Sequence, residues 1–138
     1  MRTALIALTA ALLSGCAASD ADIARQEDRA AREQVRLNRA LAGFVPGQSR
    51  TCLNAIDRRG ARGAQYYGST ILYPLGSRIV RNDMNGNCPL RNDPILVTQT
   101  PTGDLCRGDI VQLIDRGSRF PVGSCAFGDF VTYERNRR

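Results

Sequence analysis

The stretch from Ser69 to Arg81, STILYPLGSRIVR, decides the expected fold. Ser69–Tyr73 and Arg78–Arg81 are short runs rich in β-branched, aliphatic and aromatic residues, which favour strands. The segment between them, residues 74–77 (PLGS), contains the proline and glycine typical of a turn, and its length suits a hairpin connection. We therefore expect two antiparallel strands here.

Short apolar runs of the same kind recur along the chain. We expect further strands over Arg50–Ile56, Ile95–Thr100, Asp109–Asp115 and Gly128–Glu134. The pattern of the third run also fits a helix, but the run is short and is bounded by Gly108 and Gly117, which favours a strand. About six short strands separated by turns predict a mainly β fold, a small antiparallel barrel or sandwich.

A charged segment, Ser19–Ala42, precedes the strands. It is dense in Arg, Asp, Glu, Ala and Gln, lacks proline, and contains five acidic and five basic residues. Ser19 or Asp20 can cap the start of a helix, and Gly43 can end it. The sequence thus predicts an N-terminal helix before the β domain.

The apolar residues of this helix are few. Leu37 and Leu41 share one face, whereas Val35 does not lie beside them. We expect a largely solvated helix that docks only its last turn. A coiled coil is the alternative, but the heptads of apolar residues that it requires are missing.

The first fifteen residues have the features of an export signal. Arg2 supplies a positive charge, and Thr3–Leu13 is an apolar run of about eleven residues, whereas a bilayer-spanning helix needs about 20. Leu13-Ser14-Gly15-Cys16 then resembles the lipobox of bacterial lipoproteins. In that motif small residues precede a cysteine whose thiol is acylated and which becomes the new N-terminus.

These features predict three parts: a lipoprotein signal peptide (1–15), a lipid-anchored helical tether (16–42) and a β domain (43–138). Ala17 and Ala18 follow Cys16, and by resemblance to Gram-negative lipoproteins the lack of Asp directly after the cysteine favours the outer membrane. We expect a cell-envelope protein that faces the periplasm and is held to the membrane by acyl chains, such as palmitate, on Cys16.

Five cysteines are present, and assigning Cys16 to the lipid leaves an even set of four in an oxidising compartment. Four cysteines allow three disulfide pairings, and the sequence does not decide among them. We predict the nested pairs Cys52–Cys125 and Cys88–Cys106, which would tie the first strand to the last. A zinc site is the alternative, but the spacings are much longer than those of zinc modules.

The composition removes several kinds of catalysis. Histidine is absent, and all nineteen basic residues are arginine. The chain therefore has no histidine base or metal ligand and no lysine for a Schiff base. Paired carboxylates are the remaining route to acid–base chemistry, and no spacing forces two of the candidates together: Asp57, Asp104, Asp109, Asp115 and Asp129. We expect no enzymatic activity.

The segment Asn82–Asn87 has the composition of a calcium loop. An EF-hand needs glycine at its sixth position and glutamate at its twelfth. Counted from Asp83, Gly86 is fourth and Pro94 is twelfth, so the motif fails. We expect a turn-forming loop here, and no metal or cofactor.

Positive charge is concentrated in the β domain. Removal of Arg2 with the signal leaves 18 − 13 = +5, and the helix is neutral. Arg58, Arg59 and Arg62 cluster in one expected loop and form a candidate anion-binding site, because guanidinium groups match phosphate and carboxylate geometry. Lipopolysaccharide, anionic phospholipid and peptidoglycan are the anions of the envelope, and nucleic acid is not an expected partner. A merely solvated basic surface is the alternative.

The residues around the cysteines form a set of motifs: Phe44-x-Pro46-Gly47-x-x-x-Thr51-Cys52-Leu53, Asn87-Cys88-Pro89-Leu90, Leu105-Cys106-x-Gly108-Asp109-Ile110 and Ser124-Cys125-x-Phe127-Gly128-x-Phe130-Val131. This set resembles an uncharacterised family of small exported proteins from sphingomonads and related proteobacteria. The resemblance covers Phe44 to about Tyr133. It implies an envelope protein with two disulfides and transfers no catalytic residue.

Taken together, the sequence predicts a non-enzymatic envelope lipoprotein that acts as a binding or structural module, with an anionic envelope component or an envelope protein as partner. Two alternatives stay open. One is an inhibitor of an envelope hydrolase such as lysozyme, and the other is a small hydrolase built on paired carboxylates.

Overall fold

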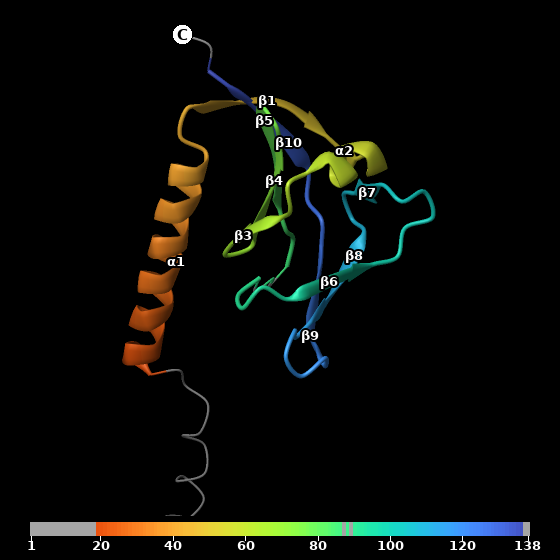
Figure 1. Cartoon of the computed structure of the whole chain (residues 1–138). Helices are drawn as coiled ribbons and strands as arrows, with labels where there is room; N and C mark the ends of the chain where they lie inside the picture. The colour runs from red at the N-terminus through yellow and green to blue at the C-terminus, as the bar shows by residue number, and fades with distance from the viewer. Residues whose placement is uncertain (1–18, 87, 89, 137–138) are drawn as a thin grey trace, which may run out of the picture. The chain divides into compact units, whose positions relative to one another are not determined.

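The structure is a computed structural model that describes residues 19–86, 88 and 90–136. The fold is mainly β, as expected, with an N-terminal helix followed by antiparallel sheets (Figure 1). It is sandwich-like rather than a closed barrel. The described elements are α1 (Asp20–Ala40), β1 (Phe44–Arg50), β2 (Cys52–Leu53), α2 (Ala55–Gly60), β3 (Gln65–Tyr67), β4 (Thr70–Leu75), β5 (Arg78–Asp83), β6 (Ile95–Thr98), β7 (Leu105–Cys106), β8 (Ile110–Ile114), β9 (Pro121–Ala126) and β10 (Phe130–Arg135).

The strands form three antiparallel sheets. The largest has the order β1-β10-β5-β4-β3, the second contains β6-β8-β9, and β2 pairs with β7. Their inward faces enclose one core, whose fully buried side chains include Leu53, Ile71, Val111, Leu113, Phe127 and Phe130. The rings of Phe127 and Phe130 lie 5.6 Å apart between centroids.

The hairpin expected around residues 74–77 is confirmed, with a tighter turn. β4 pairs with β5 from Thr70 opposite Asp83 to Leu75 opposite Arg78, so only two residues connect the strands. Gly76 has a φ of +67°, which glycine adopts without steric cost. Pro74 can lie within β4 because β3 pairs only with residues 70–72. On that side of β4, no described neighbouring strand requires the backbone N–H that proline lacks.

Four strands were not expected, and the predicted strand Arg50–Ile56 is wrong in extent. β1 ends at Arg50, β2 has two residues, and helix α2 begins at Ala55. Asn54 caps α2, since its side-chain oxygen accepts a hydrogen bond from the backbone N–H of Asp57 at 2.7 Å. The missed strands β1, β3, β7 and β9 are short or exposed, so they lack an alternating apolar pattern and depend on their neighbours for pairing.

Helix α1 docks only its end, as predicted. Leu37 is 3% exposed and packs with Leu72 and Ile79 on the five-stranded sheet, and Leu41 lies partly buried beside them. The compact unit that contains the sheets begins at Glu33. Gly43, with a φ of +81°, ends the helical segment. Among the described residues, no helix combines the length and apolar character needed to cross a membrane.

The two expected disulfides are present, but the predicted pairing is wrong. The bonds join Cys52 to Cys106 and Cys88 to Cys125. The reason is the strand order: β2, which carries Cys52, pairs with β7 and places Cys52 directly opposite Cys106. Cys125 lies on β9, which pairs with β8 in a different sheet from β2, so the strand pairing does not place it opposite Cys52.

Candidate functional site

Two of the three candidate anion-binding arginines lie on a short helix, where a loop was expected, and the third comes just after it. Arg58 and Arg59 are in the last turn of α2, and Arg62 follows it. All three are exposed, and no carboxylate among the described residues lies within 4.0 Å of them. Their role in anion binding stays a prediction. The lipidation residue, Cys16, lies outside the described residues.

Each of the five candidate carboxylates makes a structural contact. Asp57 pairs with Arg78 at 2.8 Å, and Asp129 pairs with Arg107 at 3.1 Å. The other three accept hydrogen bonds from backbone N–H groups: Asp104 from Ala55, Asp109 from Cys106, and Asp115 from Gly117 and Ser118. These are the turn and ion-pair roles that aspartate has in loops and at strand ends.

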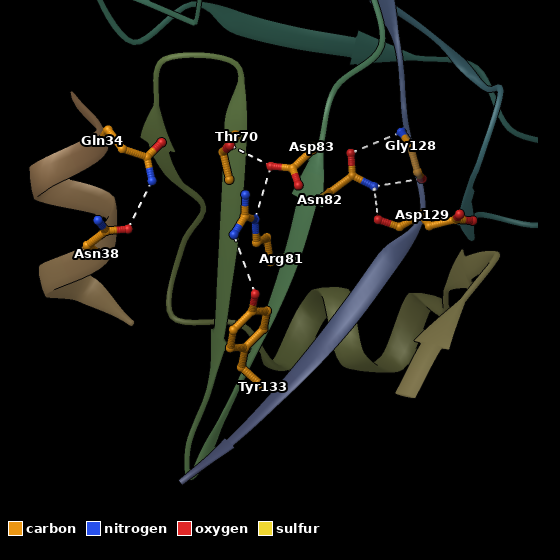
Figure 2. A network of polar contacts seen from close by, with 9 residues as sticks. All are labelled: Gln34, Asn38, Thr70, Arg81, Asn82, Asp83, Gly128, Asp129 and Tyr133. Atoms are coloured by element: carbon orange, nitrogen blue, oxygen red, sulfur yellow. Dashed lines mark hydrogen bonds and ion pairs between the residues drawn. The ribbon is translucent and has the colours of Figure 1, made fainter. Parts of the chain in front are cut away.

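The residues that resemble a calcium loop are used to join strands (Figure 2). Asn82 and Asp83 end β5 instead of opening a loop, which corrects the predicted boundary. Asp83 accepts hydrogen bonds from Thr70 at 2.6 Å and Arg81 at 3.0 Å. Asn82 is completely buried and bonds to the backbone before β10. Within the described part of the chain, no group of three or more Cys, Asp or Glu side chains is arranged to hold a metal ion.

A pocket that the sequence did not predict lies between the end of α1, β3 and the segment after Cys88. Its volume is about 410 Å³, within the range of small-molecule sites. It is lined by Glu33, Arg36, Tyr66, Gly68, Leu90, Arg91, Asn92 and Asp93. We refer to it as the Arg91 pocket.

The backbone that carries Arg91 turns sharply. Asn92 and Asp93 have φ values of 64° and 50°, in the left-handed region that these two residue types tolerate best after glycine. Asn-Asp-Pro at residues 92–94 is a turn signal that could have located this bend from the sequence. No signal in the sequence indicated that this bend lies close to α1.

Three contacts fix this segment to the rest of the domain. Before Arg91, the Cys88–Cys125 disulfide ties it to β9, and the backbone N–H of buried Leu90 donates to the carbonyl of Gly68 at 3.2 Å. After Arg91, Arg116 donates to the Asp93 carbonyl at 3.1 Å and pairs with its carboxylate at 3.0 Å. The wall of the pocket is therefore held in place before a ligand arrives, which lowers the entropy cost of binding.

The helical wall is also ordered. Arg36 pairs with Glu33 at 2.9 Å, and its guanidinium carbon lies 5.5 Å from the ring centroid of Tyr67 on β3. The contact with Tyr67 holds this arginine against the sheet. It is possible because Leu37, the next residue, anchors the same turn of α1 in the apolar cluster.

Tyr66 supplies a neutral hydroxyl. Burial, and then the charge of Asp93, raise the pKa of its phenol, and the Arg116 charge opposes them. The phenol therefore keeps its proton at neutral pH and can donate a hydrogen bond. Its ring packs against the core, which fixes its direction.

Not every charged side chain that lines the pocket has an ion-pair partner in the described part of the chain. Glu33 pairs with Arg36, and Asp93 pairs with Arg116. Arg91 is exposed and has no carboxylate within 4.0 Å among the described residues. The lining of the pocket thus includes one unpaired guanidinium, a phenol and the Asn92 amide, groups that can bind a carboxylate or phosphate oxygen.

Comparison of the chain with protein families, curated proteins and solved structures gave no match.

Proposed function

We propose that this protein is a lipid-anchored, non-enzymatic binding module of the bacterial cell envelope, facing the periplasm from the outer membrane. The lipobox at Leu13–Cys16 supports the anchor, and the charged helix before the sheets supports a tether. The structural contacts of the five candidate carboxylates favour binding over acid–base chemistry.

The observation that carries the proposal is the unpaired guanidinium of Arg91 at a pre-ordered pocket. A charge-assisted hydrogen bond between a guanidinium and a carboxylate is about twice as strong as a neutral one. The Tyr66 hydroxyl and the Asn92 amide add donors beside it. The lining therefore offers several donor groups to a ligand carboxylate.

The acids of the pocket narrow the class of ligand. The carboxylates of Glu33 and Asp93 also line the cavity, so its lining is not uniformly positive and is poorly suited to a polyanion such as a multiply phosphorylated sugar. They can accept hydrogen bonds from an ammonium or amide group. The mixed lining thus favours a short peptide with a free carboxylate and free N–H groups, as in the stem peptides of peptidoglycan.

The test is a binding titration by calorimetry with the full chain in detergent. The probes are a soluble disaccharide-tripeptide fragment of peptidoglycan with free carboxylates, the same fragment with its terminal carboxyl amidated, and inorganic phosphate. We expect the free fragment to bind, the amidated one to bind at least tenfold more weakly, and phosphate to compete poorly.

Variants locate the site. Arg91→Ala should weaken binding of the fragment about tenfold or more, because it removes the one unpaired cation. The matched control replaces Arg58, Arg59 and Arg62 together with alanine. Equal binding by Arg91→Ala and the unchanged chain would rule out the Arg91 pocket, and loss of salt-dependent binding in the triple variant alone would assign the ligand to α2 instead.

A further inference from the structure

The three-stranded sheet has an outer face on which apolar side chains are exposed. Val111 and Leu113 of β8 point inward and are completely buried. Their neighbour Ile110, which must point the other way, is 63% exposed, and Val97 of β6 is 40% exposed. In the strand register Val97 lies opposite Gln112, which in turn lies opposite Ser124. The side chains of this row include no charged group.

The apolar surface continues onto the turn between β8 and β9. Phe120 is 71% exposed and Val122 is 56% exposed. Val122 lies where the register of the two strands shifts, which leaves it as an extra residue on β9. We call Val97, Ile110, Phe120 and Val122 the apolar face.

The turn that presents Phe120 is held by its own hydrogen bonds. The Asp115 carboxylate accepts bonds from the N–H groups of Gly117 at 3.1 Å and Ser118 at 2.7 Å, and from the Ser118 hydroxyl at 2.8 Å. Backbone bonds of 2.9 Å from Arg119 to Asp115 and from Asp115 to Phe120 close the loop. Phe120 is therefore presented on an ordered backbone, and docking it costs little entropy.

The turn carries one cation for which the described residues provide no ion-pair partner. Arg119 is exposed and has no carboxylate within 4.0 Å among the described residues. Arg116 pairs with Asp93 at the surface, so this pair is neutral. The Asp115 carboxylate keeps its negative charge, and its hydrogen bonds come from the backbone and hydroxyl groups of the turn and not from Arg119. An uncovered guanidinium thus stands directly beside an uncovered phenylalanine.

We propose that the apolar face docks on an anionic phospholipid surface, with Phe120 and Val122 at the level of the headgroups and Arg119 at the lipid phosphates. An exposed aromatic ring and an exposed aliphatic side chain next to an unpaired arginine suit the membrane interface, where the ring lies at the level of the headgroups and the guanidinium meets lipid phosphates.

The proposal rests on the proposed lipid anchor only for the proximity of the membrane. α1 has 21 residues and is therefore about 32 Å long. An acylated Cys16, four residues before α1, would keep the domain within a few tens of ångströms of the bilayer. At such an effective concentration, a weak contact of one aromatic ring and one guanidinium is sufficient.

The test uses tryptophan as a reporter, since the chain contains none. Phe120→Trp places the reporter on the turn. Ile56→Trp is the matched control, because Ile56 is 75% exposed but lies on α2, well separated from β9, which begins directly after Phe120 (Figure 1). The full chain, with acylation verified by mass, is reconstituted into vesicles of phosphatidylethanolamine and phosphatidylglycerol at 3:1.

We expect the fluorescence of the Phe120→Trp variant to shift to shorter wavelength and to be quenched by brominated lipids, whereas the Ile56→Trp variant keeps the emission of a water-exposed indole. In the Cys16→Ser chain, which lacks the acyl anchor, added Arg119→Ser should weaken partitioning into these vesicles about fivefold. Neutral phosphatidylcholine vesicles should remove the effect of Arg119.

Two results would overturn the proposal. One is emission from the Phe120→Trp variant that stays unshifted and unquenched in the anionic vesicles, which would leave a protein as the occupant of this face. The other is equal quenching of the two tryptophan variants, which would indicate unspecific adsorption. Binding of the peptidoglycan fragment and acylation of Cys16 are measured on the same samples, so failure of the proposed function is recognised separately.

Discussion

The side chain of Asn82 exchanges two hydrogen bonds with the backbone of Gly128. Its amide nitrogen donates to the Gly128 carbonyl at 2.8 Å, and its amide oxygen accepts from the Gly128 N–H at 3.2 Å (Figure 2). Asn82 is 0% exposed, so neither bond can be replaced by water. This contact fixes the chain just before β10, the strand that lies between β1 and β5.

Asn82→Ala should lower the free energy of unfolding by about 3 kcal/mol, because it leaves a buried N–H and a buried carbonyl without partners. Urea unfolding with intact disulfides measures the change. Asn85→Ala is the control: Asn85 is exposed and its side chain makes one bond of 3.3 Å, so a loss of about 1 kcal/mol or less is expected. Equal losses in the two variants would contradict the role of burial.

Gly128→Ala should destabilise the domain by about 2 kcal/mol or more, because the added methyl group would collide with the carbonyl oxygen of Asp83. The obstacle is backbone and cannot rotate away. Gly60→Ala is the matched control, since a methyl group there meets nothing within 4 Å. Thermal unfolding of both variants tests the difference. An unchanged unfolding temperature of Gly128→Ala would show that the end of β5 and the segment before β10 can move apart without a loss of stability.

The disulfide pairing can be read directly from a tryptic digest without reduction. Cleavage after arginine places the four cysteines in four separate peptides: Thr51–Arg58, Asn82–Arg91, Asn92–Arg107 and Phe120–Arg135. We expect mass spectrometry to find the first peptide linked to the third and the second to the fourth. The nested linkage of the first to the fourth, or a free thiol, would contradict the pairing.

Removal of the two bridges should affect ligand binding differently. Each bridge contributes about 2–4 kcal/mol of stability. Only Cys88–Cys125 holds the segment that carries Arg91, so replacing both of its cysteines with serine should weaken binding of the peptidoglycan fragment severalfold under conditions where the domain stays folded. The control replaces Cys52 and Cys106, and binding should then persist.

Acid should loosen the turn that presents Phe120. Hydrogen bonds from Ser118 and Gly117 lower the pKa of the Asp115 carboxyl below its ordinary value of 3.8. A carboxyl with a lowered pKa in the folded state stabilises above its unfolded pKa, and that stabilisation disappears as the pH falls through the folded pKa. The protection of the Ser118 amide against hydrogen exchange, measured relative to its intrinsic exchange rate at each pH, should therefore fall below about pH 4.

Ser118→Ala should raise the Asp115 pKa toward its ordinary value, as followed by NMR titration, because it removes the hydroxyl donor. Ser124→Ala, at an exposed position on β9, should leave it unchanged. An Asp115 pKa that is unaffected by Ser118→Ala would contradict this account of the turn.

Cys16→Ala should abolish acylation, because no other residue of the Leu13–Cys16 motif offers a thiol. Partitioning into detergent in a phase-separation assay and the intact mass of the protein measure the result. Retention of detergent partitioning by Cys16→Ala would contradict the lipoprotein assignment.

Local sequence patterns were sufficient to predict the elements whose stabilising contacts are local. The hairpin around Gly76, the strands near residues 95–98 and 110–114, and the helix that docks through Leu37 were all predicted from spacing and turn residues. α2 was missed, although Asn54 and Asp57 form a readable cap. β1 could not be recognised because its seven residues are mostly exposed and are ordered by pairing with β10, which lies far along the chain.

The candidate site was harder to predict because it, too, depends on contacts between segments that are distant in the sequence. The sequence showed that positive charge gathers at Arg58, Arg59 and Arg62, but charge along a sequence does not reveal which guanidiniums find carboxylates in space. Arg91 appeared as one arginine among nineteen. Its position beside Tyr66 and the end of α1 depends on contacts between segments more than twenty residues apart.

The sequence by itself therefore determined the mainly β class, the N-terminal helix and the presence of two disulfides. Periodicity and capping residues can be recognised in short stretches of sequence, and the number of cysteines follows from the composition. Only the tertiary structure decided the pairing of those cysteines, the Arg91 pocket and the exposure of Phe120. These depend on strand order and on which side chains are covered, and both result from the packing of distant segments into one core.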